Sequence, residues 1–323
     1  MYNAKKICAI IPAFNEELLI AKTIQNIPEF VDHIVVVDDC STDGTPEIVK
    51  EIERENERVY YIRHNKNLGV GAALSSGYIW CRENDIDIAA VMNGDNQMDP
   101  KDLPNLIDPL IHNCADYTKG NRLVTGEAWN KIPRIRYLGN SLLTFMTKIV
   151  SGYWHVTDSQ SGYSAMNKKA LHILPFENLY KGFGVPNALL VRLNIYNLRV
   201  MDVPVNPVYG IGEKSSMKIH RVMFSIFFLL IHLFIRRMLQ KYVIRDFHPL
   251  VLFYSLGILV LILDIPLVIR LIYYWITTGY ITQINALSIL FCTLSGLQFL
   301  LFAMLFDMEA NKDLKGKDYP NTR

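Results

Sequence analysis

The chain has 323 residues, a formal net charge of +2 and a hydrophobic content of 50%. This length allows one sizeable domain and a smaller part, and the near-neutral charge excludes a global field for binding nucleic acid. The five cysteines show neither paired spacing nor a zinc pattern, so we expect reduced thiols in a protein that faces the cytosol. Composition is mixed up to about residue 215 and almost membrane-like beyond residue 221.

Four apolar runs in the first hundred residues alternate with segments typical of helices. Continuous apolar runs are typical of strands that are covered on both faces. The alternation predicts an α/β domain with a mostly parallel sheet and right-handed crossovers. The runs are ICAIIPAF, HIVVVDD, VYYIRH and DIAAVMNGD, which begin at residues 7, 33, 59 and 87.

Helix signals follow each of these runs. We expect Asn15 to cap the first helix, and Thr45 to cap the second with Pro46 at its first position. Residues 67–77 predict a glycine-bearing turn that leads into a helix, and residues 99–111 predict the next helix.

Three of the four strands end in acidic residues. In parallel sheets, ligands bind beyond the carboxyl ends of the strands. An acidic rim is an unusual place for a nucleotide unless a cation lies between them. Residues 93–100, NGDNQMDP, fit a tight surface turn, because Asn-Gly is a strong turn signal. The acidic rim nevertheless favours a loop that holds a metal ion over a simple surface turn.

The last hundred residues predict membrane association. Residues 222–235 are apolar but too short to span a bilayer, and the basic residues that follow favour a helix in the headgroup region. Residues 249–269 and 284–306 are each about one bilayer long. The connector carries Tyr273, Tyr274 and Trp275, an aromatic belt. Basic flanks place both ends of this hairpin in the cytosol.

These patterns divide the chain into four parts. We expect an α/β domain at 1–218, amphipathic juxtamembrane helices at 219–247, a transmembrane hairpin at 248–306 and a cytosolic tail at 307–323. Asp264 lies within the first span, where it is either functional or interhelical, or sits near the outer headgroups.

Five stretches together resemble glycosyltransferase family 2, specifically its dolichyl- and polyprenyl-phosphate sugar synthases of the dolichyl-phosphate mannose synthase type. The resemblance covers roughly residues 5–218. It implies a GT-A (Rossmann-like) domain followed by an amphipathic helix and two transmembrane helices. The stretches are IPAFNEE (11–17), VVVDDCSTDGT (35–45), NLGVGAALSSG (67–77), NGDNQMDP (93–100) and DSQSGYSAMNKKAL (158–171).

The first two stretches imply the site of the sugar-nucleotide donor. Asp39 has the strongest claim, since an acid that ends an apolar strand has no packing role, whereas Asp38 is expected to brace the loop. Lys214 and Ser216 lie in a stretch that resembles the family's segment ahead of the membrane, which closes over the diphosphate. A flexible basic linker fits this stretch about equally well. The other implied donor contacts are Pro12, Phe14, Asn15, Glu16 and Asn93.

The fourth stretch implies a site for Mg²⁺ or Mn²⁺. The resemblance makes Asp95 a direct ligand and Gln97 a second, holding the cation against the donor diphosphate. Asn93 stands where the family usually has its first Asp, and it supplies an amide oxygen without a charge. Metal affinity is therefore expected to be lower, or the surroundings of the ion different.

The acceptor site depends on basic residues. In the family, arginines at the places of Arg122 and Arg136, with a small polar residue such as Asn140, grip the lipid phosphate. Arginine suits this role because its planar fork binds phosphate through two hydrogen bonds. The family often has an acid in residues 182–190, where this chain has Asn187. His155, beside Trp154, is expected to be packed rather than a metal ligand.

The resemblance implies an inverting hexosyltransferase that moves a sugar from GDP-mannose or a UDP-sugar to polyprenyl or dolichyl phosphate, with Asp95, Arg122 and Arg136 as its catalytic residues. No general base is needed, because a phosphate monoester is already anionic at pH 7. One alternative is transfer to a glycolipid or glycan hydroxyl, with Asp158 as the only evident base. Another is an inactive membrane scaffold. The implied partners are the nucleotide sugar, the lipid phosphate and membrane lipid, without nucleic acid, and a homo-oligomer is left open.

Overall fold

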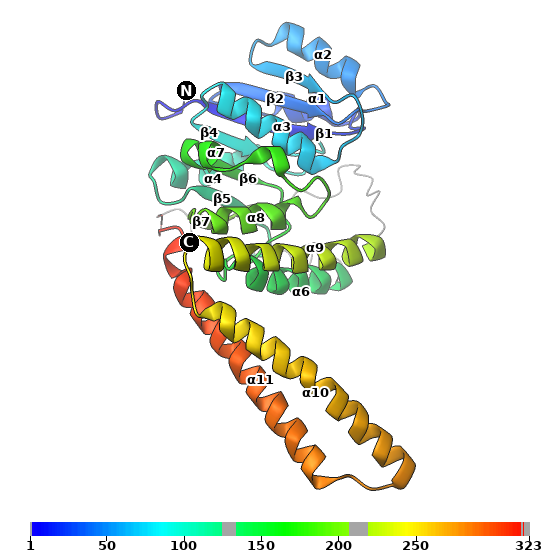
Figure 1. Ribbon diagram of the computed structural model, residues 1–323. Coiled ribbons are helices and arrows are strands. Elements are labelled where there is room, and N and C mark those ends of the chain that lie inside the picture. Colours follow the sequence, from blue (N-terminus) through cyan, green and yellow to red (C-terminus); the bar gives the residue numbers. More distant parts are fainter. Residues whose placement is uncertain (1, 125–133, 207–218, 318, 320–323) are drawn as a thin grey trace. The chain divides into compact units, whose positions relative to one another are not determined.

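The computed structural model describes residues 2–124, 134–206, 219–317 and 319, with the backbone alone for 134–138, 140 and 219–224 (Figure 1). The chain forms two compact units. The first comprises Met1–Phe234 together with Asp313–Arg323, and the second comprises Ile235–Lys312.

The first unit is built on a seven-stranded sheet with the strand order β3-β2-β1-β4-β6-β5-β7. Strand β6 is antiparallel to both of its neighbours, and the other pairings are parallel. The prediction of a mostly parallel sheet is confirmed. The strands are β1 (Ile7–Ala13), β2 (His33–Asp38), β3 (Val59–Arg63), β4 (Ile88–Val91), β5 (Tyr117–Asn121), β6 (Ser164–Asn167) and β7 (Val200–Pro204).

Helices cover both faces of this sheet (Figure 1). In β1, Ile7, Ala9 and Ile11 pack with α1, α2 and α4, whereas Cys8 and Ile10 pack with α3, α7 and α8. Burial on both faces is the reason why the strands are continuously apolar. The helices are α1 (Ile20–Gln25), α2 (Thr45–Glu55), α3 (Val70–Glu83), α4 (Leu103–Ile111), α7 (Lys168–Ile173) and α8 (Val185–Ile195), with short turns η1 (Pro100–Asp102) and η2 (Phe176–Asn178).

Both predicted helix caps are wrong. Helix α1 begins at Ile20 with Leu19 at its cap position, whereas Asn15 has a φ of 57°. Helix α2 has Gly44 at its cap position, although Pro46 does lie in the first turn. The polar side chains were diverted because each meets a donor on the other loop: Asn15 Oδ1 accepts the N–H of Thr42 (2.8 Å) and Thr45 Oγ1 accepts the N–H of Glu16 (2.9 Å).

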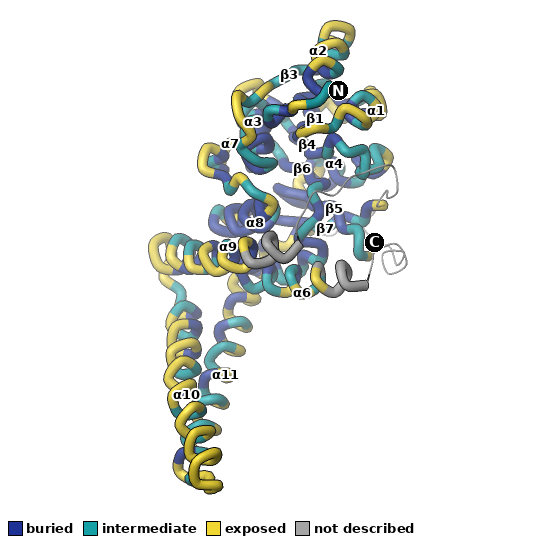
Figure 2. Tube along the Cα trace, turned by 90° about the vertical axis from the view of Figure 1, so that its right-hand side faces the viewer, coloured by how far each residue is buried: buried dark blue, intermediate teal, exposed yellow. Residues whose placement is uncertain are grey.

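Two further helices, α6 (Arg134–Ser151) and α9 (Ile219–Leu239), pack together with α8. On α9, Ile226 and Leu230 are buried against α8 and α6, whereas Phe227, Phe228 and Ile231 are exposed. Figure 2 shows that much of the described part of α9 is exposed. The described part of α9 is therefore apolar on both its packed and its outward side.

The second unit contains a hairpin of α10 (Leu250–Thr278) and α11 (Gln283–Ala310). Among the described residues, these two helices are long and apolar enough to cross a membrane. Helix α10 continues through Tyr273, Tyr274 and Trp275 to Thr278, so the aromatic residues of the predicted connector are helical. Thr293 Oγ1 donates to Asp264 Oδ2 across the hairpin (2.6 Å), so Asp264 is interhelical.

A buried ion pair joins the last turns of α9 and α11. Arg237 and Asp307 are fully buried, and both guanidinium Nη atoms contact the carboxylate at 2.9 and 3.0 Å. Lys241, in the π-helix η3 (Gln240–Arg245), donates to Asn311 Oδ1 (2.8 Å). These contacts connect the segment before the hairpin to the end of α11.

The described part of the tail rejoins the first unit, beginning with the turn η4 (Lys312–Leu314). Lys315 forms a parallel bridge with Val200 of β7, and the N–H of Gly316 donates to the Val200 carbonyl (2.8 Å). Leu314 belongs to the core between the sheet and α8. The tail therefore extends the β7 edge of the sheet through this bridge.

Candidate active site

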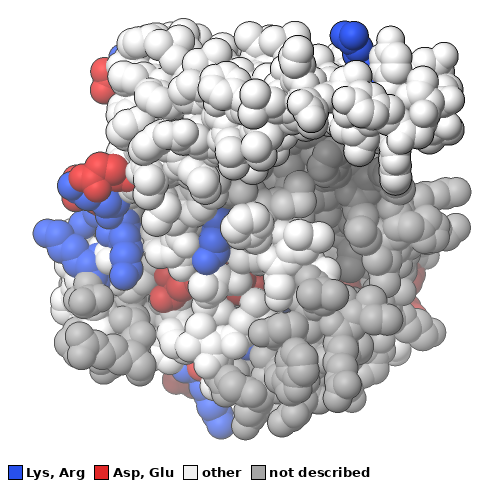
Figure 3. Space-filling model, turned by 90° about the horizontal axis from the view of Figure 1, so that it is seen from below, with Lys and Arg blue, Asp and Glu red and all other residues white. Residues whose placement is uncertain are grey.

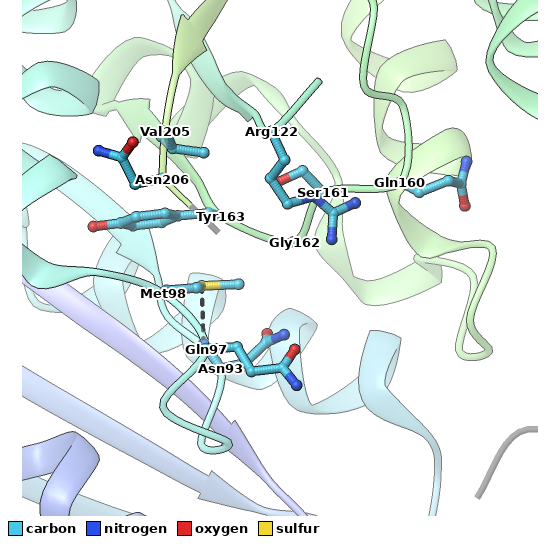
Figure 4. Close-up of a pocket in the computed structure, with 10 residues that line it drawn as sticks. All are labelled: Asn93, Gln97, Met98, Arg122, Gln160, Ser161, Gly162, Tyr163, Val205 and Asn206. Atoms are coloured by element: carbon cyan, nitrogen blue, oxygen red, sulfur yellow. Dashed lines mark hydrogen bonds between the residues drawn. The ribbon is translucent and has the colours of Figure 1, made fainter. Parts of the chain in front are cut away.

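The loops that carry the candidate residues meet at one edge of the sheet. Strands β1, β2, β4, β5 and β7 all end at this edge, and the antiparallel β6 begins there. A cavity of about 100 Å³ lies between the loops after β4, β5 and β7 and the loop before β6. It is lined by Asn93, Gln97, Met98, Arg122, Gln160, Ser161, Gly162, Tyr163, Val205 and Asn206 (Figure 4).

The loop after β4 forms one wall of this cavity. Asp95 Oδ1 accepts the N–H of Gln97 (3.1 Å), which closes a tight turn. The turn prediction for this stretch is therefore correct as a description of its backbone. A Cβ on Gly162 would lie 3.3 Å from Asn93 Oδ1, so this glycine allows the loop before β6 to approach Asn93 closely.

The oxygens of this loop fit a hard divalent cation. Asp95 supplies a carboxylate, and Asn93 and Gln97 supply amide oxygens. Among the described residues no three His, Cys, Asp or Glu side chains gather into a metal site, so phosphate oxygens of a substrate would have to complete the shell. Burial and the negative charges of Asp95 and Asp43 raise the pKa of Glu16 to about 7.

The predicted donor residues lie beside this loop. The carbonyl of Pro12 accepts the N–H of Gly94 (3.4 Å), which joins the end of β1 to the turn after β4. The N–H of Asn15 donates to Ser41 Oγ (2.9 Å), which joins the loops after β1 and β2. Phe14 is 45% exposed and is available to a ligand.

Asp39 has a structural role that its sequence position did not reveal. Its carboxylate is buried and accepts the N–H groups of Leu68 (2.9 Å) and Gly69 (2.6 Å). His64 Nδ1 lies 2.7 Å from the same carboxylate. Asp39 therefore holds the glycine-bearing turn before α3, and the expectation that it has no packing role is wrong. Asp38 braces its loop as predicted, accepting the N–H of Ser41 (2.8 Å).

That turn needs glycine at two positions. Gly69 has a φ of 92°, and the N–H of Gly71 donates to the Lys181 carbonyl (2.9 Å). A Cβ on Gly71 would lie 1.9 Å from the carbonyl oxygen of Tyr180, which no L side chain tolerates. The close approach joins the start of α3 to the loop before α8.

Arg122 and Asp158 form a two-pronged ion pair at the opposite wall. Arg122 Nε and Nη2 lie 2.8 and 3.1 Å from the two carboxylate oxygens. Asp158 also accepts the N–H groups of Arg122, Gln160 and Ser161. The adjacent guanidinium and these hydrogen bonds outweigh burial, and they hold the pKa of Asp158 below its usual range.

A cluster of hydrogen bonds that the sequence analysis did not predict holds the loop before β6 to two helices. Gln160 Nε2 donates to Asn187 Oδ1 (3.0 Å), and the same oxygen lies 3.1 Å from Thr147 Oγ1. Asn187 is fully buried, so it connects this loop to α6 and α8. The sequence could not predict this cluster from the spacing of its residues, because they lie on three segments that are far apart in the chain.

Three other predictions differ in outcome. His155 is packed, as expected: burial lowers its pKa to about 4, and Nε2 lies 2.9 Å from the Val200 carbonyl. Arg136 and Asn140 lie on the backbone of α6, but their side chains are outside the described residues. Lys214 and Ser216 also lie outside the described residues.

Comparison with known proteins identifies the class of the chain. Residues 8–174 match Glycosyl transferase family 2, and the chain belongs to that family. It is 34% identical over 244 residues to a UDP-N-acetylglucosamine–dolichyl-phosphate N-acetylglucosaminyltransferase from Methanococcus voltae, covering 71% of this chain and 96% of the relative. An undecaprenyl-phosphate mannosyltransferase from Micrococcus luteus is 26% identical over 215 residues, 66% of this chain and 87% of that protein.

A solved structure supports the same fold. Glucosyl-3-phosphoglycerate synthase from Mycobacterium tuberculosis, crystallised with Mn²⁺, UDP and glucosyl-3-phosphoglycerate, superimposes with a TM-score of 0.54 at 19% identity. The match covers 72% of this chain and 80% of that chain. The first unit is therefore a GT-A-like glycosyltransferase domain, as predicted.

Proposed function

We propose that the protein transfers a sugar from a nucleoside diphosphate sugar to a polyprenyl or dolichyl phosphate. The observation that carries this proposal is the cavity in Figure 4. Cation-suited oxygens of Asn93 and Gln97 lie on one side of it, and the Arg122 guanidinium reaches toward it from the other. Such a site can hold two anionic groups beside each other.

On the donor side, Asp95, Gln97 and Asn93 would hold Mg²⁺ or Mn²⁺. When bound, the cation supplies stabilisation of the negative charge on the departing nucleoside diphosphate. Phe14, Asn15, Glu16 and Asp39 lie on neighbouring loops and would place the nucleoside. In this arrangement Asp39 acts mainly by fixing the turn before α3.

On the acceptor side, Arg122 and Arg136 would bind the lipid phosphate, with Asn140 beside them. The phosphate oxygen attacks the anomeric carbon and inverts it, and no side chain has to remove a proton. The hydroxyl-acceptor alternative is disfavoured, because Asp158 is already paired with Arg122 and its lowered pKa makes it a poor base.

UDP-N-acetylglucosamine is the donor that we favour, and GDP-mannose is the second candidate. The relative from Methanococcus voltae is named for UDP-N-acetylglucosamine, and the one from Micrococcus luteus for mannose.

The hairpin and the exposed side of α9 would hold the protein at the membrane. Much of α10 and α11 is exposed (Figure 2), and many of these exposed residues are apolar. In the described part of the face seen in Figure 3, most of the surface is uncharged and Lys and Arg gather mainly to one side. Basic residues before the hairpin and in the tail favour both termini in the cytosol. A cysteine at Thr278 should therefore be protected from a cytosolic reagent and one at Thr322 labelled, and the reverse result contradicts this orientation.

One assay tests the catalytic proposal. Purified full-length protein is incubated with undecaprenyl or dolichyl phosphate and with UDP-N-acetylglucosamine, UDP-glucose or GDP-mannose in turn. We expect a lipid-linked sugar phosphate with one donor and release of its nucleoside diphosphate. Transfer to a glycolipid hydroxyl, with no product on lipid phosphate, would contradict the proposal.

A further inference from the structure

Lys119 is a fully buried lysine in the middle of β5, directly beneath the loop before β6. Its Nζ donates to the carbonyl oxygen of Ser161 (2.5 Å). Burial lowers the pKa of Lys119 to about 8, while the carboxylates of Asp158 and Asp202 act in the opposite direction. Lys119 is therefore charged in most molecules at pH 7. Burying an ammonium costs several kcal/mol, so its retention calls for an explanation.

Four ionisable side chains lie together at this place. Arg122 is paired with Asp158, as described above. Asp202, in β7, accepts the N–H of Thr157 (2.7 Å) and the amide of Asn121 (2.9 Å) through Oδ2. Its Oδ1 is buried and has no hydrogen-bond partner among the described residues. Burial raises the pKa of Asp202, whereas Lys119 acts against this rise and also contributes to the lowered pKa of Asp158. With both carboxylates ionised, two positive and two negative charges balance.

The balance between these four charges affects how easily a further anion, such as a phosphate, can bind at Arg122. Removing Lys119 would leave one guanidinium for two carboxylates, and a phosphate at Arg122 would then meet a net negative group. Repulsion between charges is strong where water is excluded. The hydrogen bond to Ser161 does not by itself require a charge, so the electrostatic role and the purely structural role can be separated.

We propose that Lys119 is a positioning residue for the acceptor: it supplies the charge that lets Arg122 bind a lipid phosphate while remaining paired with Asp158. The inference rests on the proposed function. It predicts that Lys119 affects the acceptor rather than the donor, although the side chain touches neither.

The test uses the full-length protein with undecaprenyl phosphate and its preferred sugar nucleotide. Turnover by the unmodified protein is measured first and tests the proposed function separately. Lys119→Met should raise the KM for lipid phosphate by about tenfold, and the KM for the sugar nucleotide should change by less than about twofold. Equal increases in both KM values, or a loss confined to kcat, would overturn the proposal.

A charge-matched variant separates charge from structure. Lys119→Met combined with Asp202→Asn removes one charge of each sign and should recover most of the acceptor KM. If the double variant folds and stays as defective as Lys119→Met, the role of Lys119 is structural only and the proposal fails.

Asp202→Asn alone keeps the proposal testable if Lys119→Met does not fold. It leaves an excess positive charge and should lower the KM for lipid phosphate below that of the unmodified protein. An unchanged or higher acceptor KM in folded Asp202→Asn would contradict the proposal.

Discussion

The guanidinium of Arg122 and the carboxylate of Asp158 face each other side-on, with Nε 2.8 Å from Oδ2 and Nη2 3.1 Å from Oδ1. This geometry uses one edge of the guanidinium fork and fixes the plane of the group. Asp158 therefore decides where Arg122 points, and the pair joins the end of β5 to the loop before β6.

Asp158→Asn should weaken acceptor binding through Arg122. An amide keeps the shape but cannot accept two charge-assisted bonds, and we expect a loss of about 1.5–3 kcal/mol in transition-state stabilisation. The measurement is kcat/KM for lipid phosphate. Arg82→Ala is a matched control, because Arg82 pairs with Glu177 at the surface (2.6 Å) and such pairs contribute little. A similar loss in both variants would contradict a specific role for Asp158.

Asp95→Ala should abolish nearly all activity, because it removes the carboxylate among the predicted cation ligands. Asn93→Asp should be tolerated and should lower the Mn²⁺ concentration needed for half-maximal rate, since it adds a charge beside Gln97. Titration of activity with Mn²⁺ and Mg²⁺ in both variants checks this. Full turnover in excess chelator would exclude the cation site.

Glu16 should make stability depend on pH. Its pKa is raised from 4.5 to about 7, so the folded state binds a proton that the unfolded state has released. The resulting stabilisation is fully present below pH 4.5 and is lost as pH rises through 7. Thermal unfolding of the metal-free protein should show this loss between pH 4.5 and 7.

Glu16→Gln should remove that pH dependence, because its amide does not ionise beside Asp95. Added Mn²⁺ should stabilise the unmodified protein more at pH 8 than at pH 5.5. An identical pH profile in Glu16→Gln and in the unmodified protein would show that another group is responsible.

Gly71→Ala should disrupt the turn before α3, because its Cβ would lie 1.9 Å from the Tyr180 carbonyl oxygen. We expect destabilisation of about 1–3 kcal/mol together with weaker binding of nucleotide. Gly139→Ala, where the Cβ meets nothing within 4 Å, is the control and should leave nucleotide affinity unchanged. Calorimetric titration with UDP and GDP measures both.

Leu314→Ala should destabilise the first unit, although the residue follows the hairpin in the chain. Leu314 is 8% exposed within the core, and truncating a buried leucine costs about 2–5 kcal/mol. Leu18→Ala is the control, because Leu18 is 78% exposed. Chemical unfolding monitored by fluorescence compares the two. Equal stability would mean that the tail contributes nothing to the core.

The order of the motifs was enough to predict the family and the loops that form the candidate site. Continuous apolar runs located β1 to β4, and the motif order indicated the family and the loop that holds Asp95 and Gln97. The same loop could be recognised because it is a contiguous stretch. Arg122 lines the cavity, but its partner Asp158, 36 residues later, was considered only as the base of the alternative reaction.

What the sequence by itself determined was local: periodic burial, glycine at the turn before α3, and two apolar helices of bilayer length. Only the tertiary structure decided that β6 runs antiparallel between β4 and β5, that the tail pairs with β7, and that Asp39 and Asn15 bind across to other loops. The physical reason is that a polar side chain takes the nearest donor or acceptor in space. For these residues that partner lies on another segment, where helix capping rules and strand periodicity carry no information.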